Sequence, residues 1–293
     1  MIDESCCKEK FNPIQKFYKY IKYKFKFAKE NPNFFYADGL VVFCGAQGEG
    51  KTLSAVNYVY NLLEKYPNSK LVTNLELKDY PIKTFNNFLT ENENTYSKLI
   101  EELGIEKANE ILEKLYKENN RVFQFVDNDD FQRYDNNEKG VIFLVDEIQL
   151  YMNSLQSKNI NLDVITQISQ QRKQRKHIVC TSQVFGRMAK PLREQFSCVI
   201  VCKNYLGFIQ CNKLIDRDSI SDEQSKTGTE IKGKVKRKFW FIHSPEYYKK
   251  YDTYKVIEKG KFVGAEEQQD IYNKEEYREV IIKDDNKSKR NSK

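Results

Sequence analysis

The chain has 293 residues, a formal net charge of +7, 40% hydrophobic residues and 13% aromatic residues. This length can form one large or two modest domains around a buried core. The first residues, MIDESCCKEK, lack the apolar centre of a secretory signal, and no run approaches the roughly 20 apolar residues that a membrane span needs. We therefore expect a folded, cytoplasmic protein.

Cysteine and histidine spacing argues against a zinc site. The seven cysteines and two histidines show no paired metal spacing. Cys198 and Cys202 are four residues apart inside SCVIVCKN, which reads as a strand. We expect reduced thiols, as is usual in the cytoplasm.

Residues 1–37 form a basic, aromatic N-terminal arm. The stretch KEKFNPIQKFYKYIKYKFKFAK holds eight lysines against Glu9, interleaved with phenylalanine and tyrosine. Lysines beside aromatic rings suit phosphates and bases, so the arm is a candidate DNA contact. An amphipathic helix with its aromatic side packed on the domain is slightly favoured, and a helix lying on a membrane surface is a third interpretation.

The next segments predict a β-α-β unit. GLVVFCG is a short apolar run typical of a buried parallel strand, and KTLSAVNYVYNLLEKY places apolar residues at helical spacing until Pro67. KLVTNLEL then reads as a second strand. Further strands are expected at VIFLV, IVCTSQ and CVIVCKN, with a polar helix at VITQISQQRKQRKH between the first two. Strands alternating with helices predict an α/β fold with a mainly parallel sheet.

Two regions depart from this alternation. Residues 84–140 contain helical periodicity in SKLIEELGIEKANEILEKLYKEN followed by a polar, turn-rich stretch, which predicts a helical insert within a domain of residues 38–206. Residues 207–283 suggest short strands, either a small β-rich extension or closing strands of the sheet. The tail, residues 284–293, has almost no apolar residue and is expected to be disordered.

The segment GAQGEGKT completes a phosphate-binding pattern between a predicted strand and a predicted helix. Its glycines let successive backbone N–H groups point inward at the helix N-terminus. Lys51 is expected to reach the β- and γ-phosphates of ATP, and Thr52 to hold Mg²⁺. The candidate nucleotide-binding residues are Gly45, Ala46, Gln47, Gly48, Glu49, Gly50, Lys51, Thr52 and Asp146.

Hydrolysis is indicated by the acids that follow the apolar run VIFLV. Asp146 lies at the carboxyl end of a predicted strand, where a Mg²⁺-binding carboxylate faces the phosphate loop, and Glu147 beside it is placed to orient an attacking water. One strand separates the loop from these acids along the chain, as in ATPases with an additional strand and a catalytic glutamate. A GTPase is disfavoured because NKLID, residues 212–216, has one residue too many for N-K-x-D.

The segment QRKQRKHIVCTSQVFGRMAKPLREQ adds further candidate catalytic residues. Gln183 ends the strand after the acidic one and is placed to sense the γ-phosphate. An arginine at a subunit edge can stabilise the transition state in a neighbouring subunit. Arg172 and Arg175 are preferred over Arg193 for this role, and Arg187 belongs to the same cluster.

The combination of GAQGEGKT, VIFLVDEIQ and IVCTSQ resembles the HerA/FtsK superfamily of DNA-pumping ATPases, including viral genome-packaging ATPases and Zot-like assembly proteins of filamentous phages. The resemblance covers roughly residues 38–205, and DEIQ is particularly close to the Zot-like version. It implies a P-loop fold. Lys51 and Thr52 would then contact phosphate and magnesium, Asp146 and Glu147 would contact the metal and the attacking water, and Gln183 would be the polar sensor. Zot-like proteins usually carry a membrane span after the ATPase domain, and none is expected here.

From this resemblance we expect a ring-forming ATPase that moves DNA, taken as double-stranded, into a phage or mobile-element capsid through a portal vertex. If the source is a virus, the ring works in the host cytoplasm. One alternative is a Zot-like morphogenesis ATPase acting at a membrane through partner proteins. Another is a DNA-binding switch of the AAA+ kind, in which Thr181 or Ser182 is the sensor.

Overall fold

The computed structural model describes residues 13–32, 34–36, 39–155, 162–220, 231 and 233–251. All of them belong to one compact unit, Met1–Asp252. The predicted strands within residues 251–264 and the predicted disordered tail lie, apart from Tyr251, outside the described residues. None of the described helices is both long and apolar enough to cross a membrane.

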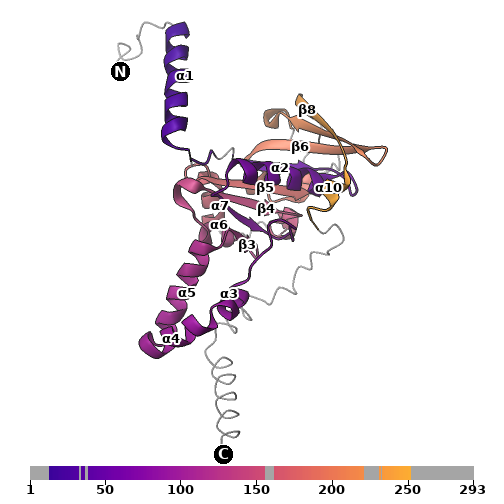
Figure 1. The fold of residues 1–293 in the computed structure, drawn as a ribbon. Helices are drawn as coiled ribbons and strands as arrows, with labels where there is room; N and C mark the ends of the chain where they lie inside the picture. The colour runs from indigo at the N-terminus through magenta and orange to yellow at the C-terminus, as the bar shows by residue number, and fades with distance from the viewer. Residues whose placement is uncertain are drawn as a thin grey trace, which may run out of the picture. The chain divides into compact units, whose positions relative to one another are not determined.

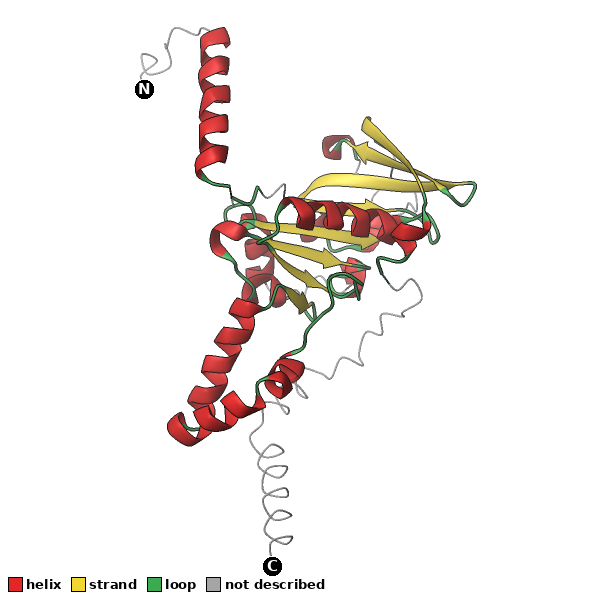
Figure 2. Ribbon diagram, in the orientation of Figure 1, coloured by secondary structure: helices red, strands yellow, loops and turns green. Residues whose placement is uncertain are grey.

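An eight-stranded sheet in the order β3-β2-β4-β5-β1-β6-β7-β8 forms the centre of the fold (Figures 1 and 2). The strands from β3 to β6 run parallel, and β7 and β8 are antiparallel additions. Their bounds are β1 Leu40–Cys44, β2 Lys70–Thr73, β3 Val122–Gln124, β4 Val141–Val145, β5 Lys176–Ser182, β6 Phe196–Tyr205, β7 Ile209–Ile215 and β8 Val235–Ile242. The predicted α/β class with a mainly parallel sheet is confirmed.

Helices cover both faces of the parallel strands, which explains their uninterrupted apolar sequences. All five residues of β1 and all five of β4 are buried. Helix α2, Lys51–Lys65, covers one face with Leu53, Val56 and Val59. Helix α7, Leu162–Gln170, contributes Val164 and Ile168 to the core on the other face, together with the short helix α8, Lys190–Arg193.

The strand order agrees with the additional-strand type of P-loop fold that the element order suggested. Strand β5 lies between β1 and β4 and pairs with both. Register places Thr181 beside Phe43 of β1 and Cys180 beside Val145 of β4. The phosphate loop after β1, the acids after β4 and the end of β5 therefore meet at the carboxyl edge of the sheet.

Helices occupy much of the expected insert. They are α3 Phe85–Glu91, α4 Glu93–Leu103 and α5 Ile105–Asn119. Strand β3, which the sequence interpretation did not identify, follows α5 and pairs in parallel with β2. The short helix α6, Asp130–Arg133, comes next. The insert thus returns to the edge of the sheet before β4 begins.

The region after residue 206 supplies closing strands of the sheet, the second of the two interpretations left open. Strand β7 pairs with β6, and β8 pairs with β7. The short helix α10, Pro245–Tyr248, follows β8 and contacts α2. Cys198 and Cys202 are strand residues of β6, as predicted, and burial raises the pKa of the Cys202 thiol to about 12.

One predicted helix is shorter than its sequence suggested. The polar helix was expected to include Arg172 and Arg175, but α7 ends at Gln170. The chain then turns, and Arg175 adopts a left-handed conformation with a φ of 55°. The turn allows Lys176 to start β5, where its buried side chain donates to the backbone oxygen of Phe131 at 2.8 Å. The arginines therefore lie in a turn.

Candidate functional site

The loop between β1 and α2 packs against strands β6 and β7. A Cβ atom at Gly45 would lie 2.8 Å from the backbone oxygen of Cys202, and one at Gly50 would overlap Oε1 of Gln210. Gly50 also has a φ of 71°, a conformation that favours glycine. Residues 46–48 between them are exposed. The loop is therefore fixed on its protein side and open on its solvent side.

The side chain and backbone of Glu49 fasten the loop to β6 and β7. Its Oε2 atom accepts a hydrogen bond from the backbone N–H of Asn204 at 2.5 Å. Its backbone oxygen accepts one from Nε2 of Gln210 at 3.0 Å. Gln210 also donates to Asn212, which accepts from Ser54 of α2. Glu49 thus connects loop, helix and sheet, a role that its place in the motif did not indicate.

Lys51 begins α2 and is only 6% exposed. Its Nζ atom donates to the backbone oxygen of Ala46 at 3.0 Å, so the ammonium group lies across the loop. A lysine at this point presents its positive charge where the loop's N–H groups and the helix N-terminus would draw a phosphate.

Asp146 ties the phosphate loop to the two central strands. Its Oδ1 atom accepts from Oγ1 of Thr52 at 2.9 Å and from Oγ1 of Thr181 at 2.7 Å. Burial, the larger influence, raises the pKa of Asp146, while the hydrogen bonds from the two threonines lower it. The structure thus brings Thr52 and Asp146 together, as their predicted shared ligand requires.

A residue that the sequence interpretation missed holds Asp146 from the other side. Asn74 follows β2, and its side chain both donates to the backbone oxygen of Asp146 at 2.9 Å and accepts from its backbone N–H at 2.8 Å. This pair of bonds fixes the turn at the end of β4. The available signal was the position of Asn74 directly after a strand that neighbours the acidic one.

Glu147 has a left-handed backbone with a φ of 52°, and its N–H donates to Oγ1 of Thr181 at 2.9 Å. Its carboxylate accepts from two side-chain amides. Nε2 of Gln183 lies 3.0 Å from Oε1, and Gln149 donates to Oε2. Glu147 and Gln183, which were predicted separately as site residues, are therefore in direct contact. Gln149 is a third member of this group that the sequence interpretation missed.

The preferred arginines lie at the opposite edge of the sheet. Arg172 and Arg175 precede β5, whereas Gln183 follows it, and seven strand residues span roughly 20 Å. The Arg175 guanidinium lies 3.7 Å from Oε1 of Glu138 and 4.3 Å from the ring centroid of Phe34. Neither arginine can therefore reach the nucleotide loop of its own chain.

The other two arginines follow β5. Arg193 ends α8, three residues before β6 starts at the amino edge. Arg187 is exposed in the turn Phe185–Arg187, directly after the carboxyl end of β5. The next residue, Met188, forms a bridge with Asn153, beyond the acids of β4. Arg187, the arginine given least weight from sequence, is thus the one nearest in the chain to the carboxyl edge.

The oxygen atoms at this edge fit a magnesium ion. A threonine hydroxyl and a carboxylate are the hard ligands that Mg²⁺ takes when phosphate and water complete its shell. Thr52 and Asp146 would hold it, since their side chains already share a hydrogen bond. Among the described residues no cluster of histidine, cysteine or acidic side chains is arranged to hold a metal by itself.

A glycine-rich loop between the first strand and its helix, facing paired acids with one strand between them, defines a P-loop NTPase of the additional-strand type. The family model described as Zonular occludens toxin (Zot) matches residues 39–252. The chain therefore belongs to the Zot family. No curated protein sequence matches it significantly.

Several solved structures are similar to the chain. The N-terminal domain of zonular occludens toxin from Neisseria meningitidis has 17% identity and a TM-score of 0.42, over 73% of this chain and 98% of that one. The genome-packaging NTPase B204 of Sulfolobus turreted icosahedral virus 2, in complex with ATP-gammaS, has 11% identity and a TM-score of 0.33, over 57% of this chain and 75% of that one. The flagellar accessory protein FlaH from Methanocaldococcus jannaschii has 12% identity and a TM-score of 0.36, over 71% of this chain and 86% of that one.

Proposed function

We propose that this protein is an ATPase that moves DNA during the assembly of a phage or mobile-element particle. The observation that carries the ATPase part is the contact between the phosphate-loop helix and the acidic strand, Thr52 to Asp146, beside the Glu147–Gln183 pair. Bound ATP would place its phosphates on the loop and on Lys51. Mg²⁺, held by Thr52 and Asp146, would neutralise phosphate charge.

Within this mechanism Glu147 orients and polarises the attacking water. Its carboxylate carries hydrogen bonds from Gln149 and Gln183, so a change at the γ-phosphate that draws Gln183 away would free Oε1 for the water. This arrangement favours Gln183 as the sensor over the AAA+ alternative. Thr181 is bonded to Asp146, and Ser182 donates to the backbone oxygen of Val184.

Two substitutions test the chemistry. Lys51→Ala removes the cation that faces the phosphates and is expected to abolish ATP binding. Glu147→Gln is expected to retain ATP binding but to hydrolyse at least ~100-fold more slowly, since the water loses its base. Binding is measured by calorimetry and turnover by phosphate release. Near-normal turnover by Glu147→Gln would refute the assignment.

The DNA part of the proposal is supported by the charge of the antiparallel strands. Strands β6, β7 and β8 contain no aspartate or glutamate. Strand pairing and alternation place five basic or aromatic residues on the face opposite the phosphate loop: Lys203, Tyr205, Lys213, Lys238 and Trp240. The rings of Tyr205 and Trp240 stack with centroids 5.8 Å apart, and Nζ of Lys203 lies 5.7 Å from the Tyr205 centroid. Lysines beside exposed rings suit phosphates and bases.

Membership of the Zot family supports one type of particle over the other. Because the Zot family includes assembly proteins of filamentous phages, we place particle morphogenesis through partner proteins ahead of filling a capsid through a portal. Fluorescence anisotropy with single-stranded and duplex DNA distinguishes the substrates, and ATP-driven displacement of a strand-bound roadblock tests movement. ATPase activity that DNA neither binds nor stimulates would refute the DNA part alone.

We propose a ring in which Arg172 or Arg175 acts on a neighbouring subunit's nucleotide, since neither reaches the loop of its own chain. Arg172→Ala or Arg175→Ala is then expected to slow the assembled ATPase while leaving ATP affinity intact. Mixing either variant with Glu147→Gln should restore part of the activity, since each supplies what the other lacks. Arg187→Ala is the comparison variant. If it alone is defective and mixing restores nothing, the arginine acts within its own chain.

A further inference from the structure

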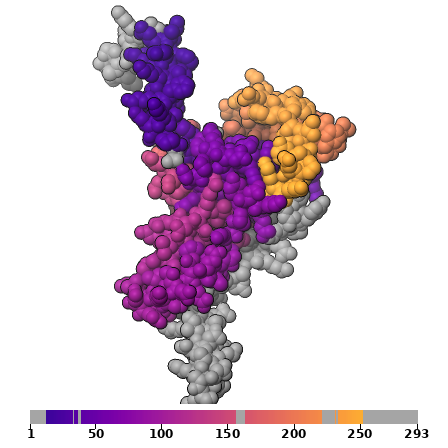
Figure 3. Space-filling model, in the orientation of Figure 1, coloured from indigo at the N-terminus to yellow at the C-terminus, as the bar shows by residue number. Residues whose placement is uncertain are grey.

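The N-terminal helix α1, Pro13–Glu30, has no buried residue among those the structure describes. With 3.6 residues per turn, Ile14, Phe17, Ile21 and Phe25 recur at helical spacing and share one side with Tyr18. Exposed fractions are 79% for Ile14, 67% for Phe17 and 74% for Phe25. Figure 3 draws this helix in indigo. This apolar side is much larger than an isolated exposed side chain, and such surfaces mark binding sites.

Three lysines of α1 lie beside the apolar side. Lys19, Lys22 and Lys26 recur at spacings of three and four residues and lie roughly 80–160° around the helix axis from Ile14 and Ile21, on what we call the lysine side. The only acidic residue of the helix, Glu30, lies 3.7 Å from Lys26. Lys24 and Lys29 fall at the two borders of the apolar side. Long lysine side chains at such borders reach polar groups while their stems lie on apolar surface.

The contacts between α1 and the segment that follows it involve neither the lysine side nor the centre of the apolar side. The Phe27 ring packs edge-on against Phe34, with centroids 4.9 Å apart. Nζ of Lys24 lies 5.4 Å from the ring centroid of Tyr36. Phe27 falls between the lysine side and the Lys24 border of the apolar side. These contacts attach the helix to the chain that follows. Among the described residues Ile14, Phe17 and Phe25 remain exposed, against the expectation that the aromatic side packs on the domain.

The composition of the apolar side decides between partners. A nucleic-acid surface needs lysines and rings on one side so that phosphates and bases are bound together, as on β6 to β8. Here the apolar side includes Ile14 and Ile21, which cannot stack on bases. A second copy is disfavoured because α1 carries six lysines and one glutamate, so paired helices would repel. An anionic lipid surface offers acyl chains and negative headgroups at once.

We propose that α1 lies on an anionic membrane surface, with Ile14, Phe17, Ile21 and Phe25 among the acyl chains and Lys24 and Lys29 at the phosphate groups. The inference stands independently of the proposed ATPase and DNA activities. It assigns the helix a peripheral attachment that does not require a membrane span.

Vesicle flotation of the whole protein tests this inference. Phosphatidylcholine vesicles containing phosphatidylglycerol are expected to carry the protein, and pure phosphatidylcholine vesicles to carry much less. Phe25→Asn should lower the partition coefficient at least ~10-fold, since the phenylalanine ring would no longer be buried among the acyl chains. Gln15→Asn, on the lysine side, is the matched control and should float as the unmodified chain does. Thermal melting verifies that both variants fold.

Three results would overturn the inference. Equal flotation on both vesicle types, or none, would show that anionic lipid is not the partner. Loss of DNA binding in Phe25→Asn without a change in flotation would assign the helix to nucleic acid. Concentration-dependent self-association that Phe25→Asn abolishes, with flotation unchanged, would assign the apolar side to a second copy.

Discussion

The parallel and antiparallel halves of the sheet use β-structure for different purposes. Strands β1 and β4 are buried on both faces and carry polar residues only beyond their carboxyl ends. Strand β8 is almost entirely exposed, and its lysines and rings lie along its length. A strand covered by helices on both faces can present functional side chains to a ligand only at its end. An exposed strand can present side chains along one whole face. The contrast separates hydrolysis from the proposed nucleic-acid contact.

Truncating one phenylalanine in each half is the strongest test of this contrast. Phe143 of β4 is fully buried, so Phe143→Ala should lower the free energy of unfolding by about 3–5 kcal/mol. Phe239 of β8 is 43% exposed, so Phe239→Ala should cost under ~1 kcal/mol. Urea unfolding of both variants measures the difference. Equal losses would mean that the antiparallel half is buried in the native protein.

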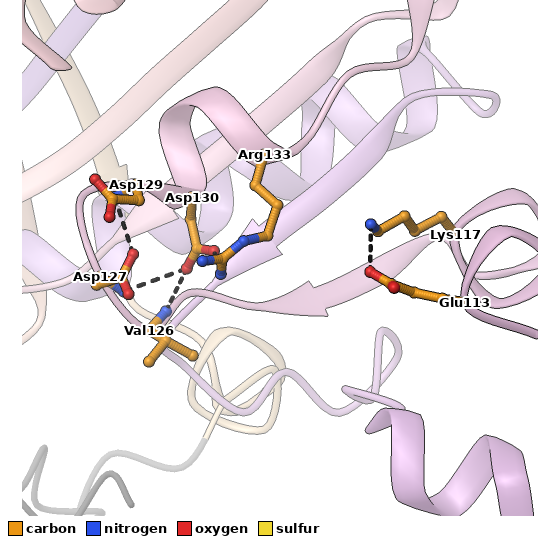
Figure 4. A network of polar contacts seen from close by, with 7 residues as sticks. All are labelled: Glu113, Lys117, Val126, Asp127, Asp129, Asp130 and Arg133. Atoms are coloured by element: carbon orange, nitrogen blue, oxygen red, sulfur yellow. Dashed lines mark hydrogen bonds and ion pairs between the residues drawn. The ribbon is translucent and has the colours of Figure 1, made fainter. Parts of the chain in front are cut away.

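A buried carboxylate in helix α6, which packs against the parallel strands, should make the stability of the protein depend on pH. Asp130 is fully buried at the start of α6, where Oδ2 accepts from the N–H groups of Val126 and Asp127 and Oδ1 lies 2.5 Å from Nη1 of Arg133 (Figure 4). Burial raises the pKa of Asp130 from 3.8 to about 6, although these hydrogen bonds and Arg133 lower it. The folded protein therefore holds this proton more tightly than the unfolded chain.

Because the folded-state pKa is raised, the contribution of Asp130 to stability is fully present below pH 3.8 and is lost as pH rises through 6. Relative to Asp130→Asn, the unmodified chain should lose up to about 3 kcal/mol of unfolding free energy between roughly pH 4 and pH 7. Urea unfolding across this range measures it. Asp127→Asn, at a more exposed carboxylate, is the control, and parallel curves for Asp130→Asn and the unmodified chain would contradict the assignment.

A smaller effect tests the support that the antiparallel half gives to the phosphate loop. Gln210 is fully buried and donates to Glu49 of the loop and to Asn212. Gln210→Ala should weaken ATP binding roughly 5- to 10-fold, the value of about one hydrogen bond that positions the loop. Calorimetric titration with ATP measures it. Unchanged affinity would mean that the loop keeps its shape without β7.

The smallest expected effect lies on the opposite face of the same strands. Lys238→Ala removes one phosphate contact, so it should reduce the slope of log affinity against log salt for DNA by about 1. ATP affinity should stay at the level of the unmodified chain. Salt titrations of DNA binding provide the slope. If Lys238→Ala weakened ATP binding and Gln210→Ala weakened DNA binding, the two faces would not be functionally distinct.

The sequence by itself determined the class of the protein, because its strongest signals are local. GAQGEGKT requires glycines at fixed positions before a helix, and VIFLV followed by two acids requires a buried strand that ends at a polar edge. Both patterns are set by backbone conformation and burial within a few residues, so the loop, Asp146, Glu147 and Gln183 could be predicted from spacing.

The tertiary structure decided which distant residues complete the site. Asn74, Thr181 and Gln210 contact the acids or the loop from 35 to 161 residues away along the chain, a separation that no periodicity encodes. Strand order also placed Arg172 and Arg175 at the amino edge of the sheet. Both residues precede β5, and residues that precede a parallel strand lie at the edge opposite its carboxyl end, where the site is. In α1 the local pattern predicted a helix, but only the exposure of Ile14, Phe17 and Phe25 in the tertiary structure showed that its apolar side is not part of the core.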